Sequence, residues 1–576
     1  MKLILHYLKR YPLLLLCNVI SVFGFALVEL GIPTIIAQMI DVGVQNQDQQ
    51  YILQMGMLIL VISLIGVSGT LLLGFCGAKI STNITRDIRN DIFQKVQSFS
   101  HTEFNHFTIS SLITRTNNDA FQIQLFVNVI LRTGLMTPVM IVVSYVMIIS
   151  ASLQLSYVVI ATIPFIIGGV IYVAKKSEPI SEKQQSFLDR MNRISKENLT
   201  GVRVIRSFTN DDYEQSRFNE TNDVYTNQSK HLFKMMNMTG PIFFLLMNIA
   251  AVLIYWISAN MIDAQTIQIG KIVAFMDYLF HAMFSVMLFC LVFVQYPRAN
   301  VSAKRIQAVF DCDPLIHNEG KVMGNDRIKS LCFDHVSFVY PDGEEAILKD
   351  VSFQVKKGET IAFIGSTGSG KSTLINLIPR FYDCSEGCIR INGIAIKDYD
   401  IDALRSKIGF IPQKAVLFNS TIAENIRYGK QDASNEEVIH AAKVAQAYDF
   451  IMEKENGFDE MISEGATNVS GGQRQRLSIA RALVRKPSLY IFDDSFSALD
   501  FKTDAKLRRE LKKETKDAIV MIVAQRISSI MDANQIIVLN EGHVVGMGTH
   551  KELLQQCQIY REIALSQLSE EELFHA

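Results

Sequence analysis

Charge is scarce in this chain, and it is missing altogether from several long stretches. Charged residues make up 20% of the 576 residues, against about 25% in an average soluble protein. Residues 133–174 contain no Asp, Glu, Lys or Arg. As a helix this stretch would extend roughly 60 Å, twice the roughly 30 Å of a bilayer core. It therefore predicts two membrane spans joined by a tight turn near residues 152–156.

Further charge-free stretches cover residues 11–28, 49–78, 235–262 and 278–297. Each is long enough for about one membrane-spanning helix, which brings the expected set to six. The first apolar stretch continues past Glu29 to Ile40, longer than the apolar part of a signal peptide. We therefore expect a retained span and a lipid bilayer as the surroundings of this half of the chain.

Cysteine and an excess of one charge sign are also lacking. The eight cysteines are scattered too thinly for a disulfide framework. Lys and Arg total 56 and Asp and Glu total 57, so the net charge is −1. Without an overall basic balance, no nucleic-acid partner is expected.

The basic residues predict the orientation of the spans. Lys2, Lys9 and Arg10 precede the first span, whereas the connection at 41–50 has no Lys or Arg. Basic residues return after the second, fourth and sixth spans. Because positive loops stay inside, we expect a multi-pass protein of the cell membrane with both termini cytoplasmic. The polar stretches 79–128 and 175–238 keep helical spacing and are expected to extend the helices into the cytoplasm.

The second half of the chain carries a phosphate-binding motif. Residues 365–372 read Gly-Ser-Thr-Gly-Ser-Gly-Lys-Ser, between an apolar strand at 360–364 and an expected helix at 373–378. This matches G-x-x-x-x-G-K-[ST], whose glycines let backbone N–H groups surround phosphate oxygens. Lys371 is expected to contact the β- and γ-phosphates and Ser372 to ligate Mg²⁺. Short β-rich runs alternate with amphipathic helices from about residue 331, as in α/β domains.

Two other elements fit a nucleotide site. A predicted strand at 488–492 ends in Asp493 and Asp494, where such sites place the carboxylate that binds Mg²⁺. Alternatively, Asp494 or Ser495 caps the next helix. Residues 470–473, Ser-Gly-Gly-Gln, precede a basic helix and form a second candidate anion-binding helix start.

Together these motifs resemble the ATPase domain of ABC transporters, and the order of the two halves resembles an exporter-type half-transporter. The fold expected from this is a membrane domain of six transmembrane helices with long cytoplasmic extensions, followed by an α/β P-loop ATPase domain. The expected boundaries are 1–298 for the membrane domain, 299–330 for a connection and 331–576 for the ATPase domain. The resemblance implies ATP and Mg²⁺ as cofactors and a small-molecule substrate.

The resemblance also implies roles for single residues. Tyr340 matches the aromatic that stacks on adenine, although a packed strand tyrosine is an alternative. Gln413 matches the glutamine that senses Mg²⁺ and faces the membrane domain, and Asp493 the Mg²⁺-binding aspartate. Residues 497–500 match the loop that crosses between two ATPase domains. The implied nucleotide-binding residues are Tyr340, Gly365, Ser366, Thr367, Gly368, Ser369, Gly370, Lys371, Ser372, Thr373, Ser470, Gly471, Gly472 and Gln473, with Ser372, Gln413 and Asp493 at the metal.

In this family the signature motif, here Ser470 to Gln473, closes over the nucleotide of a second ATPase domain. The resemblance therefore implies a dimer with two composite sites. Asp494 stands where the family has the glutamate that polarises water, and Gln525 where it has a histidine beside the γ-phosphate. The catalytic positions Asp494, Gln525 and Gln413 thus depart from the pattern at two places.

Aspartate is shorter by about 1.5 Å, and glutamine cannot carry a positive charge. We therefore hypothesise that this chain's own site binds ATP but hydrolyses it poorly. Its intact signature would serve a different second half-transporter, as in the degenerate-site subunit of bacterial heterodimeric multidrug exporters. A homodimer with two slow sites, a sensor with the same architecture and an importer with the exporter fold remain alternatives.

The membrane half offers weaker signals. Residues 107–119 and 197–208 resemble the two coupling segments of the family, although plain solvated helix would look similar. Glu29, Asp277 and His281 are ionisable groups in or near spans, where such groups often face a cavity or a partner. They are candidates for contacting a cationic substrate or, alternatively, for bonding between helices.

Overall fold

The computed structural model describes residues 1–324, 326–568 and 573. The chain divides into two compact units. One comprises Met1–Gln97 and Ile109–Cys312, and the other comprises Ser98–Thr108 and the chain from Asp313 on.

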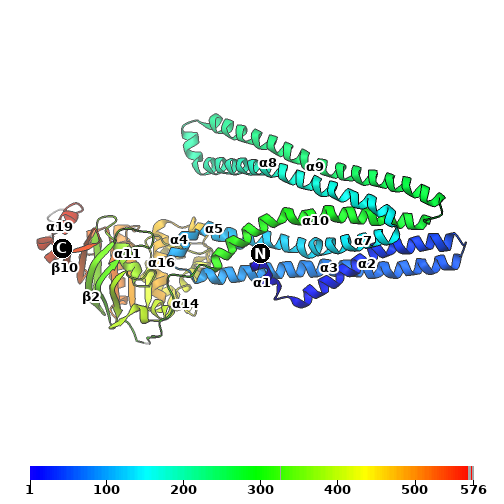
Figure 1. Cartoon of the computed structure of the whole chain (residues 1–576). Coiled ribbons are helices and arrows are strands. Elements are labelled where there is room, and N and C mark those ends of the chain that lie inside the picture. Colours follow the sequence, from blue (N-terminus) through cyan, green and yellow to red (C-terminus); the bar gives the residue numbers. More distant parts are fainter. Residues whose placement is uncertain (325, 569–572, 574–576) are drawn as a thin grey trace. The chain divides into compact units, whose positions relative to one another are not determined.

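The first unit is entirely helical (Figure 1). Within the described residues, six helices are long and apolar enough to cross a membrane, as the charge-free stretches predict. The α-helices are α1 (Lys2–Leu8), α2 (Pro12–Gln38), α3 (Gln49–Gln97), α5 (Ile109–Thr114), α6 (Ala120–Val129), α7 (Leu135–Ala151), α8 (Leu153–Ser207), α9 (Asp211–Asp263) and α10 (Ile269–Phe310). Short π-helices interrupt them at η1 (Met39–Val44), η2 (Arg115–Asp119) and η3 (Ile130–Gly134).

The turn inside the longest charge-free stretch lies where the sequence places it. Ser152 separates α7 from α8, and its hydroxyl oxygen caps α8 by accepting a hydrogen bond from the N–H of Leu155. The prediction of a tight turn near residues 152–156 is confirmed. The boundary proposed at residue 298 falls inside α10, which continues to Phe310 because no helix-breaking turn follows the charged residues there.

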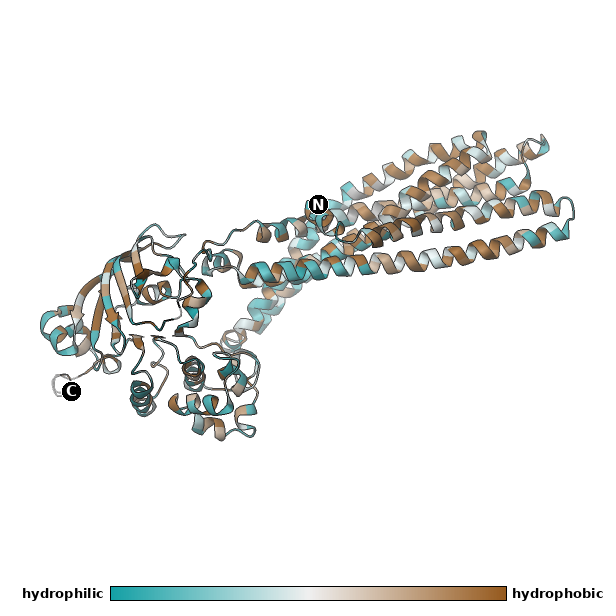
Figure 2. Ribbon diagram, turned by 90° about the horizontal axis from the view of Figure 1, so that it is seen from below, coloured by the Kyte–Doolittle hydropathy of each residue, from teal (hydrophilic) through white to brown (hydrophobic). Residues whose placement is uncertain are grey.

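Hydropathy divides the helical unit along its length. In Figure 2 hydrophobic residues dominate one end of the helices and hydrophilic residues the other. Toward the hydrophilic end, Ile80, Ile84, Ile88 and Ile92 are fully buried on α3. Their spacing of four residues places them on one face of the helix, against α1, α6 and α10. Large apolar side chains such as Leu64 and Leu71 stay exposed on the apolar end of α3, as lipid-facing residues would.

The second unit is built on two sheets. The smaller sheet has the order β2-β1-β4-β5, and the larger has β10-β9-β3-β8-β7-β6. All neighbours in the larger sheet are parallel except the edge strand β10. The strands are β1 (Ser330–Phe338), β2 (Leu348–Lys356), β3 (Thr360–Gly365), β4 (Glu386–Ile391), β5 (Ile394–Ala395), β6 (Ile408–Ile411), β7 (Leu489–Asp493), β8 (Ile519–Val523), β9 (Gln535–Asn540) and β10 (His543–Gly548).

Helices cover one face of the larger sheet, and the other face packs against helices and the smaller sheet, so β7 and β8 are buried at every residue. Such strands read as unbroken apolar runs, which is typical of parallel sheets. The helices of this unit are α4 (His101–Phe107), α11 (Lys371–Leu377), η4 (Ile396–Asp398), α12 (Ile401–Ser406), α13 (Ile422–Arg427), α14 (Asn435–Val444), α15 (Tyr448–Met452), η5 (Gly457–Asp459), η6 (Glu464–Ala466), α16 (Gly471–Val484), α17 (Phe501–Glu514), η7 (Ile527–Ser529), α18 (His550–Gln556) and α19 (Gln558–Leu565).

The short helix α4 belongs to the second unit although its sequence lies between helices of the first. Ser100 and Glu103 form a capping box at its start. The Glu103 carboxylate accepts hydrogen bonds from the N–H groups of Ser100 (2.6 Å) and Leu315 (3.1 Å). The ring of His101 packs on Phe381, with ring centres 5.2 Å apart.

This arrangement corrects one expectation. The segment that groups with the second unit is 98–108, so most of the predicted coupling segment 107–119 lies in the helical unit instead. The capping box at Ser100 and Glu103 is the sequence signal that locates the helix. The other predicted segment, 197–208, lies at the end of α8, and its coupling role stays a prediction.

The anchoring of α4 can be tested through Glu103. Burial opposes ionisation of this carboxyl group, but its hydrogen bonds to Ser100 and Leu315 hold its pKa below the usual value. Glu103→Ala removes these bonds, each worth about 1.5–3 kcal/mol for a charged acceptor. The two bonds together contribute about 3–6 kcal/mol, so we expect the α4 amides to exchange with deuterium at least about a hundredfold faster in the full-length chain. The exposed Asn105→Ala on the same helix is the control, and equal exchange in both variants would contradict the anchoring.

Candidate nucleotide site

The larger sheet gathers the predicted site residues at one edge. The loop 366–370 follows β3, Gln413 follows β6, Asp493 ends β7 with Asp494 directly after it, and Gln525 follows β8. Because these strands are parallel, their carboxyl ends meet at the same edge, where open α/β sheets bind ligands.

The glycine-rich loop has a conformation that side chains would disturb. A Cβ atom added at Gly365 would lie 2.0 Å from the carbonyl oxygen of Leu539 on the adjacent strand β9. Gly368 has a φ of +85°, with open space around its Cα. The loop therefore needs glycine at the first position for close backbone approach and at the second for a left-handed conformation.

Lys371 closes over this loop. Its Nζ donates hydrogen bonds to the carbonyl oxygens of Gly365 (2.9 Å) and Ser366 (2.7 Å) and to the hydroxyl of Ser369 (3.2 Å). Burial lowers the pKa of Lys371, while the nearby Asp494 and Asp493 oppose that shift. The ammonium group thus lies at the loop where the motif predicts phosphate oxygens.

Ser372 and Asp493 form a pair of oxygen donors. The Ser372 hydroxyl donates to Oδ1 of Asp493 at 3.0 Å. Burial raises the pKa of Asp493, and Ser372 and Lys371 partly offset it. A hydroxyl and a carboxylate oxygen suit Mg²⁺, which takes few protein ligands and completes its shell with water and phosphate oxygens. The donor set therefore fits the predicted metal.

Asp494 is the point where three predicted catalytic residues meet. Its Oδ2 accepts a hydrogen bond from Nε2 of Gln525 at 3.0 Å and from Nε2 of Gln413 at 3.4 Å. Its backbone adopts a φ of +45°, with its N–H donated to the carbonyl oxygen of Val523. The alternative that Asp494 or Ser495 caps the next helix is wrong, because Asp500 caps α17.

Tyr340 lies just beyond β1 and reaches the start of α11. Its hydroxyl is 3.0 Å from the hydroxyl of Thr373, and its ring packs edge-to-face on Phe338 and Tyr382. The stacking role on adenine stays a prediction, as does the alternative of a structural tyrosine.

The signature residues Ser470 to Gln473 begin α16. The Ser470 hydroxyl accepts from the N–H of Gln473 (3.2 Å), and the Gln473 side chain accepts from the N–H of Ser470 (3.0 Å). This capping box fixes the start of the helix, because each of the two side chains bonds the backbone N–H of the other residue.

Sequence reasoning missed Gln567. Its side chain donates to the carbonyl oxygen of Gln525 (2.8 Å) and accepts from the N–H of Ile527 (2.9 Å). It therefore holds the turn that carries Gln525. A glutamine beyond α19 offers no sequence signal for this role, because the contact spans some forty residues of chain.

In the helical unit the structure joins two of the predicted ionisable residues. Nε2 of His281 on α10 lies 3.4 Å from a carboxylate oxygen of Glu29 on α2. Tyr278, three residues before His281, shares a hydrogen bond of 2.6 Å between its hydroxyl and that of Thr34. Asp277 is exposed on the same helix.

Comparison with known proteins agrees with both halves of the chain. Residues 15–287 match the ABC transporter transmembrane region, and residues 348–497 match the ABC transporter ATPase family. An uncharacterized ABC transporter ATP-binding protein of Bacillus subtilis, YfiB, is 36% identical over 98% of both chains. This chain belongs to the ABC transporter family. An ATP-dependent lipid A-core flippase of Vibrio parahaemolyticus is 29% identical over 98% of this transporter and 97% of its own length.

Among solved structures, a bacterial Atm1-family ABC exporter with ATP bound is similar in fold. Its TM-score is 0.78 at 23% identity, over 96% of this transporter and 98% of that chain. The transporter is thus a half-transporter with the exporter fold, fusing a membrane domain to an ABC ATPase domain. Such an ATPase domain implies ATP binding.

The two glycines of the loop provide a test of the site. Gly368→Ala meets no atom and incurs only the left-handed penalty of about 1–2 kcal/mol, so ATP affinity should fall by about thirtyfold or less. Gly365→Ala forces the end of β3 away from Leu539 and should weaken binding at least tenfold more. Binding of a fluorescent ATP analogue to the full-length transporter measures both. A larger loss in Gly368→Ala would show that the loop has another conformation.

Proposed function

We propose that this transporter is one half of an ATP-driven exporter that moves amphipathic small molecules out across the cell membrane. Residues 1–298 form its transmembrane domain, 299–330 the connection and 331–576 the ATPase domain, with both termini cytoplasmic. Its partner is a second, different half-transporter. Its own nucleotide site binds ATP and Mg²⁺ but hydrolyses slowly, and its signature serves the partner's nucleotide.

The geometry of the loop supports the proposed binding roles. Lys371 contacts the β- and γ-phosphates, and the backbone N–H groups of residues 365–373 surround the phosphate oxygens. Ser372 and Asp493, already paired, hold Mg²⁺ together with Gln413. Tyr340 stacks on the adenine. These groups bind and orient the nucleotide, so ATP binding needs nothing further from Asp494.

The observation that carries the hydrolysis claim is the pairing of Asp494 with two amides. A general base must present an oxygen to the attacking water, yet Oδ2 of Asp494 already accepts from Gln525 and Gln413. The side chain is also about 1.5 Å shorter than glutamate. A small misplacement at a reacting centre costs about a hundredfold in rate. Gln525, which cannot carry charge, leaves the γ-phosphate without a cation from that position.

The double variant Asp494→Glu with Gln525→His tests this account. It lengthens the base and frees it from the Gln525 amide. With the partner's own hydrolysis site inactivated, we expect the remaining ATPase rate of the dimer to rise at least tenfold, within the range of about a hundredfold expected from geometry.

The matched control is Asp494→Gln with Gln525→His, which has the same length without a carboxylate and should give no rise. An unchanged rate in the glutamate variant, with ATP binding intact, would contradict the impaired site.

The substrate class is supported by a groove in the helical unit. It encloses about 570 Å³ between α8, α9 and α10, and aromatic and methionine side chains are six of its fourteen lining residues, including Phe165, Tyr172, Met238 and Phe243. Polarizable, flexible side chains accommodate varied apolar ligands. Lys176 and Thr239 add polar groups at the same groove, which suits an amphipathic molecule.

Export and charge preference can be measured together. Deletion of the transporter should raise the cellular accumulation of its substrates, whereas an importer's loss would lower it.

If Glu29 contacts cationic substrates, Glu29→Gln should reduce resistance to cationic compounds several-fold and leave resistance to neutral compounds unaffected. Glu178→Gln, outside the Glu29–His281 pair, is the control. An unchanged resistance profile would mean that the Glu29–His281 pair serves helix packing and not substrate contact.

A further inference from the structure

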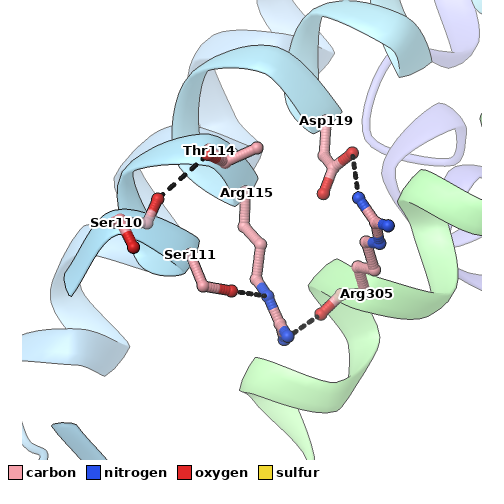
Figure 3. Close-up of a pocket in the computed structure, with 6 residues that line it drawn as sticks. All are labelled: Ser110, Ser111, Thr114, Arg115, Asp119 and Arg305. Atoms are coloured by element: carbon pink, nitrogen blue, oxygen red, sulfur yellow. Dashed lines mark hydrogen bonds and ion pairs between the residues drawn. The ribbon is translucent and has the colours of Figure 1, made fainter. Parts of the chain in front are cut away.

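A polar pocket of about 390 Å³ lies within the helical unit, and it shares no lining residue with the nucleotide site or the apolar groove. It is formed by α5 and η2 on one side and by α10 on the other (Figure 3). Hydroxyl and charged groups line it: Ser110, Ser111, Thr114, Arg115, Asp119 and Arg305. The π-helix η2 turns Arg115 and Asp119 toward α10, and π-helical segments are frequent at functional sites.

Asp119 carries a carboxylate oxygen that lacks a donor. Its side chain is only 7% exposed. Oδ1 accepts a hydrogen bond from the Ser302 hydroxyl at 2.8 Å, but the buried Oδ2 has no hydrogen-bond partner among the described residues. A buried acceptor without a partner costs about 1–3 kcal/mol or more when charged. Oδ2 therefore calls for a hydrogen-bond donor from a ligand.

The two arginines beside Asp119 differ in how they are held. Arg115 is positioned by Nε donating to Ser111 (3.2 Å) and Nη1 donating to the carbonyl oxygen of Arg305 (2.8 Å). The Arg305 guanidinium is more than half exposed and lies 3.9 Å from Asp119, too far for a hydrogen bond. The exposed Arg305 side chain has room to turn outward. A ligand between the two residues can then replace their long contact with one hydrogen bond to Arg305 and one to Asp119.

The charges select the ligand. Two guanidinium groups and one carboxylate leave one positive charge, which a singly charged anion balances. The same anion must also donate a hydrogen bond to Oδ2 of Asp119. A protonated phosphate meets both demands, because its P–OH donates while its other oxygens accept from Arg305. Sulfate has no O–H to donate, and an ammonium group would add to the positive charge.

We propose that this pocket binds a singly charged, protonated phosphate group between Asp119 and Arg305. A lipid headgroup is a poor source. Arg115 lies about 27 Å along the helix from the charge-free stretch that begins at Thr133, whereas the headgroup layer adds only about 5–7 Å to the apolar core. The ligand is therefore a soluble one, either inorganic phosphate or a small phosphate monoester.

The test is calorimetric titration of the full-length transporter. Every variant carries Lys371→Ala, so that phosphate bound at the nucleotide loop does not contribute. The probes are inorganic phosphate, glycerol 3-phosphate and sulfate at matched ionic strength near pH 6. We expect phosphate or its monoester to bind at least tenfold more tightly than sulfate. Affinity should fall as pH rises toward 8, because the monoester loses its second proton with a pKa of about 6.

Substitutions localise the effect. Arg305→Ala should weaken phosphate binding about tenfold and Arg305→Lys less, while Lys304→Ala, an exposed neighbour, should not alter it. Asp119→Asn should remove the preference over sulfate, because the amide no longer repels an anion without a proton. Binding of glycerol 3-phosphate alone would identify a monoester as the ligand. Equal binding of phosphate and sulfate, no binding of either phosphate probe, or unchanged affinity in both Arg305 variants would overturn the proposal.

Discussion

The hydrogen bond from Gln525 to Asp494 depends on how the parallel sheet brings its strand ends together. β6, β7, β8 and β3 each end at the same edge, and the residue that follows each strand is therefore held near the others. The positions of the glycine-rich loop, of Asp493 and Asp494, and of Gln525 all depend on this register. A change at one strand end therefore alters contacts at the next, because Gln413 and Gln525 both donate hydrogen bonds to Oδ2 of Asp494.

The two units of the chain are suited to different surroundings. The helical unit exposes leucines such as Leu64 to lipid at one end and buries a row of isoleucines at the other. The ATPase unit buries whole strands between helices. The helix α4, pinned by Glu103 and His101, is the piece of the membrane half that joins the ATPase unit. The chain continues from this helix directly into α5 of the helical unit.

Much of this architecture could be predicted from the sequence, because periodicity and charge act locally. The absence of charge between Thr133 and Ala174 located the turn at Ser152, and the phosphate loop identified its strand and helix. The remainder depends on contacts between distant residues. The bonds from Gln525 to Asp494, from Gln567 to the Gln525 turn, and from His281 to Glu29 follow from tertiary packing that no local pattern encodes. The family resemblance places the first coupling segment at 107–119, whereas the capping box of Ser100 and Glu103 starts α4 at His101.

The central claim is that this chain works with a different partner because its own site hydrolyses slowly. The most direct measurement is native mass spectrometry of the complex purified, through a tag on this 64.9 kDa chain, from the cell that naturally makes it. The account predicts one copy of this chain with one copy of a second half-transporter that has glutamate and histidine at the altered positions. A dimer containing only this chain would contradict it, because both nucleotide sites would then carry Asp494 and Gln525.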